Sequence, residues 1–314
     1  MNKIRITLLA GGWSGERDVS LRSAEAVYNA LDKSKYDVSM YDPQDNQNLK
    51  GLMELRDNVD LVFNLLHGKH GEDGRIQGLL DILGIGFIGS GVLSSAMAFN
   101  KKIAKDIYKT KGLMVAKDII LRTGEEVLPE RLVEILGLPA VVKPVAEGSS
   151  LGISICRNME TLVAGIQKAF EFDHEVMVEE FIDGTEITCC VLGNRVLDTL
   201  PVIEIVPGDS YCFFDYEAKY KADATQEICP ARLSQSITER AQVCAKEAHE
   251  ALKCSVWSRS DMIIKDKAIY LLETNTIPGM TQNSLFPLAA RTAGISFPRL
   301  LDKLIGLSLA KNGP

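Results

Sequence analysis

Residues 257–275 read WSRSDMIIKDKAIYLLETN and give the clearest indication of the fold. Apolar residues dominate both halves of this stretch, and the short polar turn 265–267 separates them, as is typical of an antiparallel β-hairpin. Each half also carries polar residues two positions apart, and residues two apart on a strand point to the same face. The sequence therefore predicts a hairpin with a polar face that interrupts an apolar sheet.

The polar face of this hairpin carries four side chains. Once the strands pair, its carboxylates and amide should converge, and such oxygen ligands suit Mg²⁺ or Mn²⁺ beside substrate phosphates. A neighbouring guanidinium could neutralise charge on a phosphoryl group in transfer. A solvated strand face is the competing interpretation, but polar groups at matched positions favour a site. The residues are Arg259, Asp261, Glu273 and Asn275.

The N-terminal part of the chain, up to about residue 95, alternates between predicted strands and helices. This alternation favours a small parallel α/β domain. The glycines of GxGxxG at 84–89 follow a helix instead of opening one, which argues against a dinucleotide site. Strands are expected over 4–10, 36–42 and 59–67, and helices over 18–31 and 75–84.

The rest of the chain predicts a mixture of strands and helices around one long irregular segment. Residues 207–230 lack periodicity and carry five aromatic residues with Lys219 and Lys221, so a lid is favoured over an ordered surface excursion. Before the hairpin, strands are expected over 138–145, 152–158, 175–183, 186–193 and 195–206, and helices over 94–112, 160–170 and 236–253.

Three further positions are candidates for ligand binding. Lys143 ends a predicted strand before the turn 147–150, which is rich in backbone and hydroxyl donors, and could hold nucleotide phosphates. Glu16 and His67 follow two N-terminal strands, and α/β sheets bind ligands at the carboxyl ends of their strands. Each feature taken alone is more often structural: a Gly-Ser turn is usually just a turn, and a loop His or Glu is usually solvated.

Bulk composition limits the function classes. The 314 residues predict two or three domains. A net charge of −7 without a long Lys/Arg run argues against a nucleic-acid or membrane surface. The N-terminal apolar run is too short for a signal peptide, and no stretch approaches a membrane span. Seven cysteines without CxxC indicate reduced thiols in a cytoplasm and give little support to zinc.

Several stretches in order along the chain resemble the D-alanine–D-alanine ligase family of the ATP-grasp superfamily. They are GGWSGERDVSL, LLHGKHGEDGRIQGLL, GSGVLSSAMAFNK, VVKPVAEGSSLGIS, FDYEAKY and LLETNTIPGMTQNSL. The resemblance implies a three-domain ATP-grasp fold, combining α/β and α+β parts. It implies an N-terminal α/β substrate domain over 1–95, a central domain over 96–184, and a C-terminal domain over 185–314 with lid loop 207–230.

The same resemblance implies a binding site for ATP and two Mg²⁺ (or Mn²⁺) ions. Lys101 and Lys143 would contact the phosphates, and Lys219 would bring the lid onto the γ-phosphate. Glu179 would lie at the adenine and Glu186 at the ribose. The metal ligands implied are Asp261, Glu273 and Asn275.

The reaction implied joins two D-alanine molecules through an acylphosphate, in a homodimer. Glu16 and His67 would hold the first substrate, Arg259 and the Gly279 backbone N–H the tetrahedral intermediate, and Ser284 and Leu285 would border the second substrate. Glu16, Ser149 and Tyr220 would tie the lid to the site. Tyr220 favours an amine as acceptor. Rival interpretations are an ATP-grasp ligase that uses D-lactate, D-serine or another amine, and a non-catalytic nucleotide or amino-acid sensor.

Overall fold

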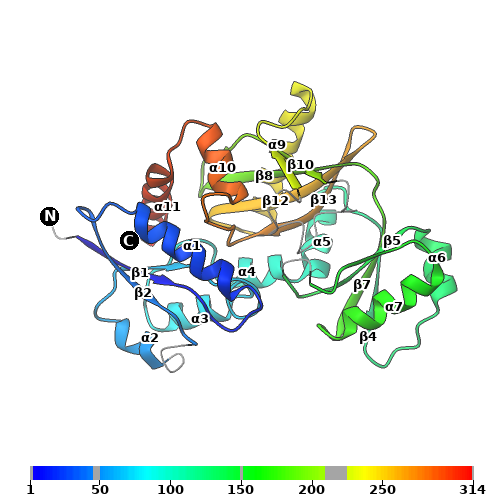
Figure 1. Ribbon diagram of the computed structural model, residues 1–314, viewed down its shortest axis with the longest axis horizontal. Coiled ribbons are helices and arrows are strands. Elements are labelled where there is room, and N and C mark those ends of the chain that lie inside the picture. Colours follow the sequence, from blue (N-terminus) through cyan, green and yellow to red (C-terminus); the bar gives the residue numbers. More distant parts are fainter. Residues whose placement is uncertain (1–2, 45–49, 149–150, 209–224, 313–314) are drawn as a thin grey trace.

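The computed structural model describes residues 3–44, 50–148, 151–208 and 225–312. Its strands form three sheets, which follow one another along the chain (Figure 1). The first is parallel and the other two are antiparallel. The mixed α/β fold class expected from the sequence is therefore confirmed.

The first sheet is built from the N-terminal segment. Because both faces of a parallel sheet are covered, its strands are expected to be apolar, and β3 is buried along its whole length. Gly84 follows α3 with φ of 70°, as expected of a residue that ends a helix and not of a dinucleotide loop. The strand order is β2-β1-β3. The elements are β1 (Ile4–Leu9), α1 (Arg17–Ala30), β2 (Tyr36–Tyr41), α2 (Lys50–Leu55), β3 (Leu61–Asn64) and α3 (Arg75–Ile82).

Two helices follow where a single helix over 94–112 was expected, and that prediction was wrong. They are α4 (Val92–Phe99) and α5 (Lys101–Thr110). Asn100 leaves the helical conformation and its side chain accepts a hydrogen bond from the Ile103 N–H, which is the geometry of an N-cap. The Lys101 N–H donates to the Val145 carbonyl instead, at 3.0 Å. The break therefore places Lys101 in the first turn of α5, against the central sheet.

The central sheet has a core of its own. Val142 and Val178 point to one face, which α6 and α7 cover, while Lys143 and Glu179 point to the opposite face. The sheet order is β4-β7-β5-β6. Its first strand and first helix were missed at the sequence level. The elements are β4 (Asp118–Arg122), α6 (Pro129–Leu136), β5 (Ala140–Pro144), β6 (Ser154–Cys156), α7 (Met159–Phe170) and β7 (Glu175–Glu180).

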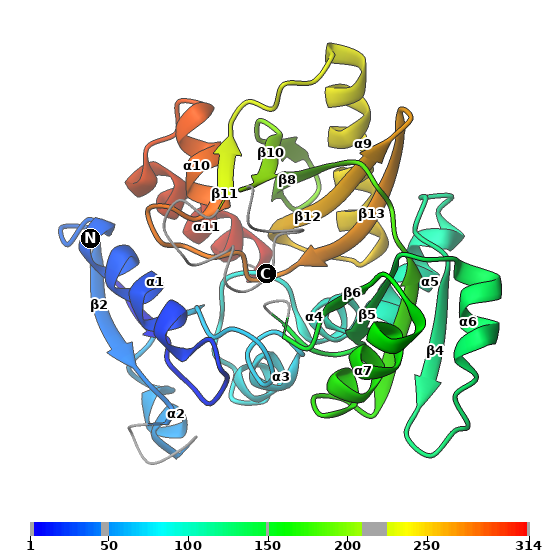
Figure 2. The same cartoon turned by 45° about the vertical axis from the view of Figure 1, so that its right-hand side comes forward.

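The C-terminal sheet contains the hairpin and lies above the central sheet in Figure 2. The strand expected over 195–206 is divided in two, because the chain leaves the sheet at Leu200 and Pro201. The segment 207–230 is partly regular: its last part forms a strand, and 209–224, including most of the expected lid, lies outside the described residues. The elements are β8 (Thr185–Gly193), β9 (Leu197–Thr199), β10 (Ile203–Pro207), β11 (Thr225–Ile228), α9 (Gln235–Ala251), β12 (Val256–Lys265), β13 (Ala268–Asn275), α10 (Leu285–Thr292) and α11 (Phe297–Asn312).

The N-terminal and C-terminal sheets share one hydrophobic core. Trp257 of β12 is 1% exposed, and its ring packs edge-on against Phe63 of β3 and Phe286 of α10, with centroid distances of 6.0 and 5.2 Å. Residues of β1 and α1 join the same core, together with α11. In the part of the chain that the structure describes, no helix is long and apolar enough to cross a membrane.

Candidate active site

The hairpin of β12 and β13 brings its four polar side chains together. Asp261 pairs with Glu273 and Arg259 pairs with Asn275 across the two strands. The turn between the strands is closed by Asp266 and Lys267, both with positive φ, as in a two-residue hairpin turn.

Asp261 is the centre of the polar cluster. The Arg259 guanidinium donates to both oxygens of Asp261, from Nε to Oδ1 at 2.9 Å and from Nη2 to Oδ2 at 2.8 Å. Thr188 Oγ1 donates to Oδ1 at 2.5 Å and Asn275 Nδ2 to Oδ2 at 3.2 Å. Although burial acts to lower it, the Asp261 carboxylate raises the pKa of Arg259. The partly buried guanidinium is therefore charged, and in this structure it is directed at Asp261.

The donor set of this cluster fits a magnesium ion. The described residues contain no group of three or more His, Cys, Asp or Glu side chains that could hold a metal by themselves. Asp261 and Glu273 with the amide of Asn275 supply hard oxygen ligands, and Mg²⁺ is typically held by one or two carboxylates together with substrate phosphates. Since the Asp261 oxygens accept from Arg259 and Asn275 here, those donors must turn away for an ion to be ligated.

A cleft opens between this hairpin and the central sheet. Lys143 lies 2.5 Å from Glu179 Oε2, and Lys101 donates to the Glu147 carbonyl at 2.6 Å. Lys101 also lies 3.7 Å from Glu273 Oε2, which links the central sheet to the hairpin. The predicted residues that line the cleft are Lys101, Lys143, Glu179, Glu186, Asp261 and Glu273.

Glu179 is 4% exposed and has a second lysine partner that the sequence analysis did not identify. Lys105 of α5 contacts the other oxygen of Glu179. Burial acts to raise the pKa of Glu179, but the charges of Lys143 and Lys105 outweigh it and hold the pKa below its usual value. The helical spacing of four between Lys101 and Lys105 was the available signal.

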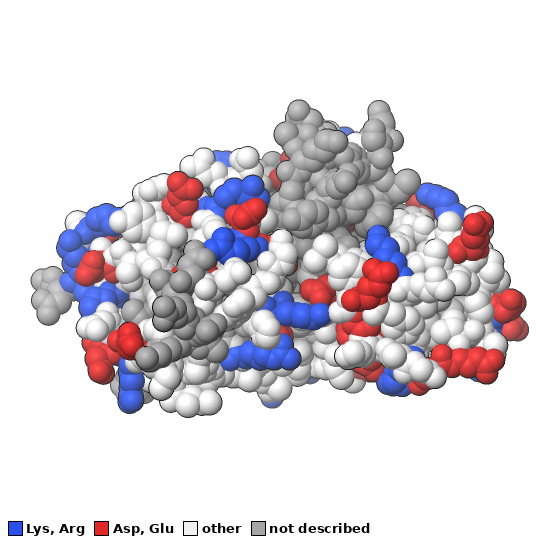
Figure 3. All heavy atoms as spheres, turned by 60° about the horizontal axis from the view of Figure 1, so that its bottom comes forward, with Lys and Arg blue, Asp and Glu red and all other residues white. Residues whose placement is uncertain are grey.

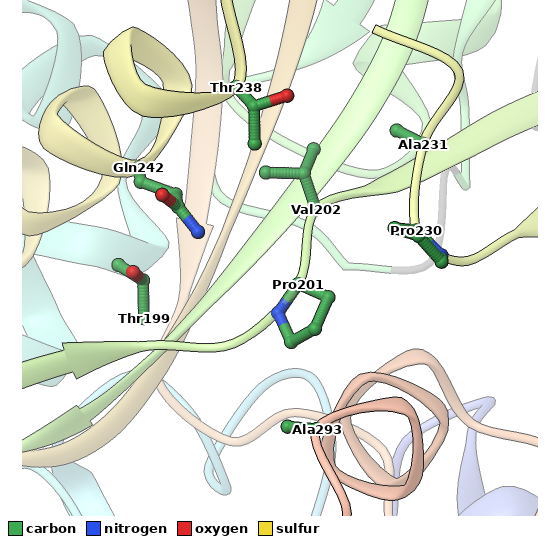
Figure 4. A pocket seen from close by; sticks show the side chains of 8 residues that line it. All are labelled: Thr199, Pro201, Val202, Pro230, Ala231, Thr238, Gln242 and Ala293. Carbon is green, nitrogen blue, oxygen red and sulfur yellow. The ribbon is translucent and has the colours of Figure 1, made fainter. Parts of the chain in front are cut away.

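A second hollow, of about 430 Å³, lies beside α9 (Figure 4). None of the residues that line this hollow is charged, and none carries a thiol, so it offers no chemistry comparable to that of the cleft. They are Thr199, Pro201, Val202, Pro230, Ala231, Thr238, Gln242 and Ala293.

Glu16 adjoins the cleft at the lining residue Gly148, whereas neither Glu16 nor His67 is among the described residues that line it. A Cβ added at Gly148 would lie 2.9 Å from Glu16 Oε2, so the Glu16 carboxylate rests against the turn after β5. His67 is buried, and its Nε2 has no hydrogen-bond partner among the described residues. Burial acts to lower the pKa of His67, but Glu72 and Glu16 raise it, while Arg259 opposes them. Charges of both the N-terminal loop and the hairpin therefore affect the pKa of His67.

The remaining candidates lie beyond β13. A Cβ at Gly279 would lie 2.9 Å from Ser284 Oγ, so a larger residue here would require the Ser284 hydroxyl to move. Ser284 precedes α10 and its Oγ accepts from the Thr281 N–H at 3.0 Å, and the buried Leu285 begins that helix. Ser149, Lys219 and Tyr220 lie outside the described residues.

On the face drawn in Figure 3, basic and acidic side chains are interspersed. This face therefore presents charges of both signs and not a field of one sign.

Two sheets that enclose a cleft lined by lysines and metal-type carboxylates define an ATP-grasp ligase. A crystal structure of D-alanine–D-alanine ligase from Bacillus anthracis complexed with ATP matches with a TM-score of 0.86 and 36% identity, covering 98% of each chain. The crystal structure of VanG D-Ala:D-Ser ligase from Enterococcus faecalis matches with a TM-score of 0.86 and 34% identity, over 98% of this chain and 100% of the other.

The chain belongs to the D-alanine–D-alanine ligase family. The family models of the D-ala D-ala ligase N-terminus and C-terminus match residues 5–49 with 42–90, and 107–306. The D-alanine–D-alanine ligase of Syntrophobacter fumaroxidans is 51% identical over 307 residues, covering 98% of both chains.

Proposed function

We propose that this enzyme joins two D-alanine molecules into D-alanyl-D-alanine, with ATP converted to ADP and phosphate, for peptidoglycan synthesis. The observation that carries the proposal is the convergence of Arg259, Asp261, Glu273 and Asn275 at one end of the cleft that Lys101 and Lys143 line. A carboxylate is a poor acyl donor, so the acid must be activated, and these groups suit phosphoryl transfer.

In the first step a carboxylate oxygen of the first D-alanine forms a bond to the γ-phosphorus of ATP. The bond between that phosphorus and the bridging oxygen breaks, and ADP leaves with its electron pair. Lys101 and Lys143 hold the phosphates, Glu179 accepts from the adenine amino group and Glu186 holds the ribose. Lys219 brings the lid onto the γ-phosphate.

Asp261, Glu273 and Asn275 are the residues that would hold two Mg²⁺ (or Mn²⁺) ions. The ions supply neutralisation of phosphate charge when bound. Arg259 turns from Asp261 toward the reacting centre, where its charge is needed.

In the second step the amine nitrogen of the second D-alanine attacks the acyl carbon, and phosphate leaves. Glu16 holds the first substrate's ammonium with help from His67, and Ser284 and Leu285 border the second substrate. Arg259 and the Gly279 N–H stabilise the oxyanion. Glu16, Ser149 and Tyr220 join the lid to the site, which excludes water from the acylphosphate.

The wider setting of the enzyme belongs to the same proposal. We assign a substrate domain to 1–95, a central ATP-grasp domain to 96–184 and a C-terminal one to 185–314, with the lid at 207–230. All six cysteines among the described residues are free, which supports a reducing cytoplasm. The functional unit proposed is a homodimer.

D-serine is the second candidate acceptor, because the D-Ala:D-Ser ligase structure matches with the same TM-score of 0.86, at 34% identity against 36% for the D-alanine–D-alanine ligase structure. The test is phosphate release by purified protein with ATP, Mg²⁺ and D-alanine, against parallel assays that add D-serine, D-lactate or L-alanine. We expect turnover with D-alanine as the sole amino acid and none with L-alanine as the sole amino acid. In the mixtures, the product formed identifies the acceptor, and we expect D-alanyl-D-alanine. Preference for D-lactate at neutral pH would contradict the assignment of an amine acceptor to Tyr220.

A further inference from the structure

Lys105 of α5 is a buried lysine that is not among the described residues lining the cleft. Lys105 is 1% exposed and its ammonium lies between two carboxylates, in contact with Glu179 Oε1 and 3.2 Å from Asp118 Oδ1. Burying a lysine is costly unless it is paired, and here two carboxylates pair it. β4 and β7 place the two carboxylates opposite each other, since Asp118 and Glu179 are register partners.

Glu179 thus has two lysine partners that differ in their access to the cleft. Lys143 contacts Oε2 of Glu179 and lines the cleft, whereas Lys105 contacts Oε1 and is absent from the described residues that line it. Phosphates that enter the cleft can draw Lys143 away. The phosphates cannot attract Lys105 in the same way, because its ammonium is also paired with Asp118.

We propose that Lys105 is the permanent counter-ion and positioning residue of Glu179, while Lys143 exchanges between Glu179 in the empty cleft and the phosphates of the bound nucleotide. This inference rests on the proposed function. Lys105 keeps the Glu179 carboxylate ionised and aimed at the base when Lys143 has left it. An ionised carboxylate only accepts hydrogen bonds, so the site selects a base with an amino group and rejects one with a carbonyl oxygen at that position.

The adjoining lysine of α5 provides a matched control. Lys109 lies one turn further on and contacts the same Asp118 at 2.9 Å, but its side chain is 45% exposed, and no contact between it and Glu179 is present. Lys109→Met therefore removes a positive charge from the same carboxylate without touching the nucleotide site. In Lys105→Met, Glu179 retains Lys143, and Asp118 retains Lys109 and Lys102, so each carboxylate keeps at least one lysine partner.

The experiment compares steady-state kinetics with ATP and with ITP, whose base carries a carbonyl in place of the amino group. For Lys105→Met we expect the KM for ATP to rise roughly tenfold or more, the preference for ATP over ITP to fall by a similar factor, and the KM for D-alanine to stay within about twofold. Lys109→Met should match the wild type in the KM for ATP, in the preference for ATP over ITP and in the KM for D-alanine. An unchanged ATP preference in a folded Lys105→Met variant overturns the inference.

A double-mutant cycle separates positioning from general loss of structure. If Lys105 acts through Glu179, Lys105→Met should add little to the KM for ATP once Glu179→Gln is present. Additive effects would overturn the inference. Loss of the preference for ATP over ITP in Glu179→Gln would support the proposed contact between Glu179 and the adenine. If Glu179→Gln leaves ATP kinetics unchanged, the proposed adenine contact fails, and the Lys105 inference falls with it.

A second variant covers the case in which Lys105→Met does not fold, as judged by circular dichroism. Asp118→Asn keeps the lysine and removes the charge that anchors it. We expect a smaller shift in the same direction, with a raised KM for ATP and a reduced ATP preference. A normal ATP preference in Asp118→Asn would overturn the idea that the anchor holds Lys105 in place.

Discussion

The two ends of the cleft differ in how their buried polar groups are satisfied. At the end formed by the central sheet, Glu179 contacts Lys143 and Lys105, so the charges are paired within the protein. At the N-terminal end, His67 is buried with an Nε2 that has no hydrogen-bond partner among the described residues. We therefore expect a ligand to exchange partners at the first end and to add a partner at the second.

This difference has energetic consequences. Replacing an internal ion pair by a ligand contact gains only the difference between two interactions, while a ligand that satisfies an unpaired buried group removes a penalty of about 1–3 kcal/mol. Contacts at the N-terminal end should therefore contribute more to substrate affinity per hydrogen bond. Contacts at the central sheet should contribute more to selectivity.

The largest expected effect lies at Arg259, where the two ends meet. Arg259→Ala should lower kcat by about 10²–10³-fold, as does removal of a donor to a developing oxyanion, while ATP binding measured by calorimetry is retained. Arg232→Ala is the matched control, because Arg232 pairs with Glu204 in the same sheet and has a side chain that is 63% exposed. Near-normal turnover by Arg259→Ala would remove this residue from the mechanism.

A smaller effect is expected at the N-terminal end. His67→Gln should raise the KM for D-alanine roughly tenfold, the lower part of the range for a hydrogen bond to a charged group, with little change for ATP. His70→Gln, an exposed position in the same loop, should leave both constants unchanged. If the KM for ATP rose instead, the contrast between the two ends would be wrong.

The cap of α5 tests the nucleotide end through its backbone. Asn100→Ala should lower the free energy of unfolding by about 1 kcal/mol and raise the KM for ATP, because Lys101 starts at the capped turn. Asn158→Ala removes the corresponding cap of α7, away from the cleft. We expect the same loss of stability in a urea titration with unchanged ATP kinetics.

The smallest effect concerns pH. Glu72 and Glu16 outweigh burial and raise the pKa of His67, so the folded state favours its charged form. That contribution to stability is fully present below the ordinary His pKa of about 6.5 and is lost as pH rises through the raised value. The unfolding free energy of the wild type relative to His67→Gln should therefore decrease over this window in urea titrations. If this difference in unfolding free energy grew with pH, the assignment of a charged His67 in the folded state would be wrong.

Local patterns in the sequence predicted the parts of the site that lie on one hairpin. A spacing of two residues was sufficient to place Arg259 beside Asp261 and Glu273 beside Asn275, because strand geometry fixes which side chains share a face. The alternating α/β character of the N-terminal part followed from periodicity. The family resemblance supplied residues such as Lys101 and Glu179 that no local pattern singled out.

What could not be predicted depends on contacts between distant segments. The helix breaks at Asn100 because the Lys101 N–H donates to the carbonyl of the distant Val145. The sequence did contain one signal of this break, since Asn before a lysine-rich helix is a common N-cap. Lys105 lies in a sequence that is typical of a solvated helix face. Its burial depends on Asp118 and Glu179, which only the folded sheet brings to it.

The shared core around Trp257 determines which parts of the enzyme can move. Since the N-terminal sheet and the C-terminal helices bury their apolar residues in one core, we expect them to move together, whereas the central sheet has a separate core. Any hinge motion should therefore swing the central sheet alone. Such a motion would admit and release nucleotide while the spacing between His67 and Arg259 stays constant. If these residues act as proposed, opening of the nucleotide site would leave the acyl group aligned with its acceptor.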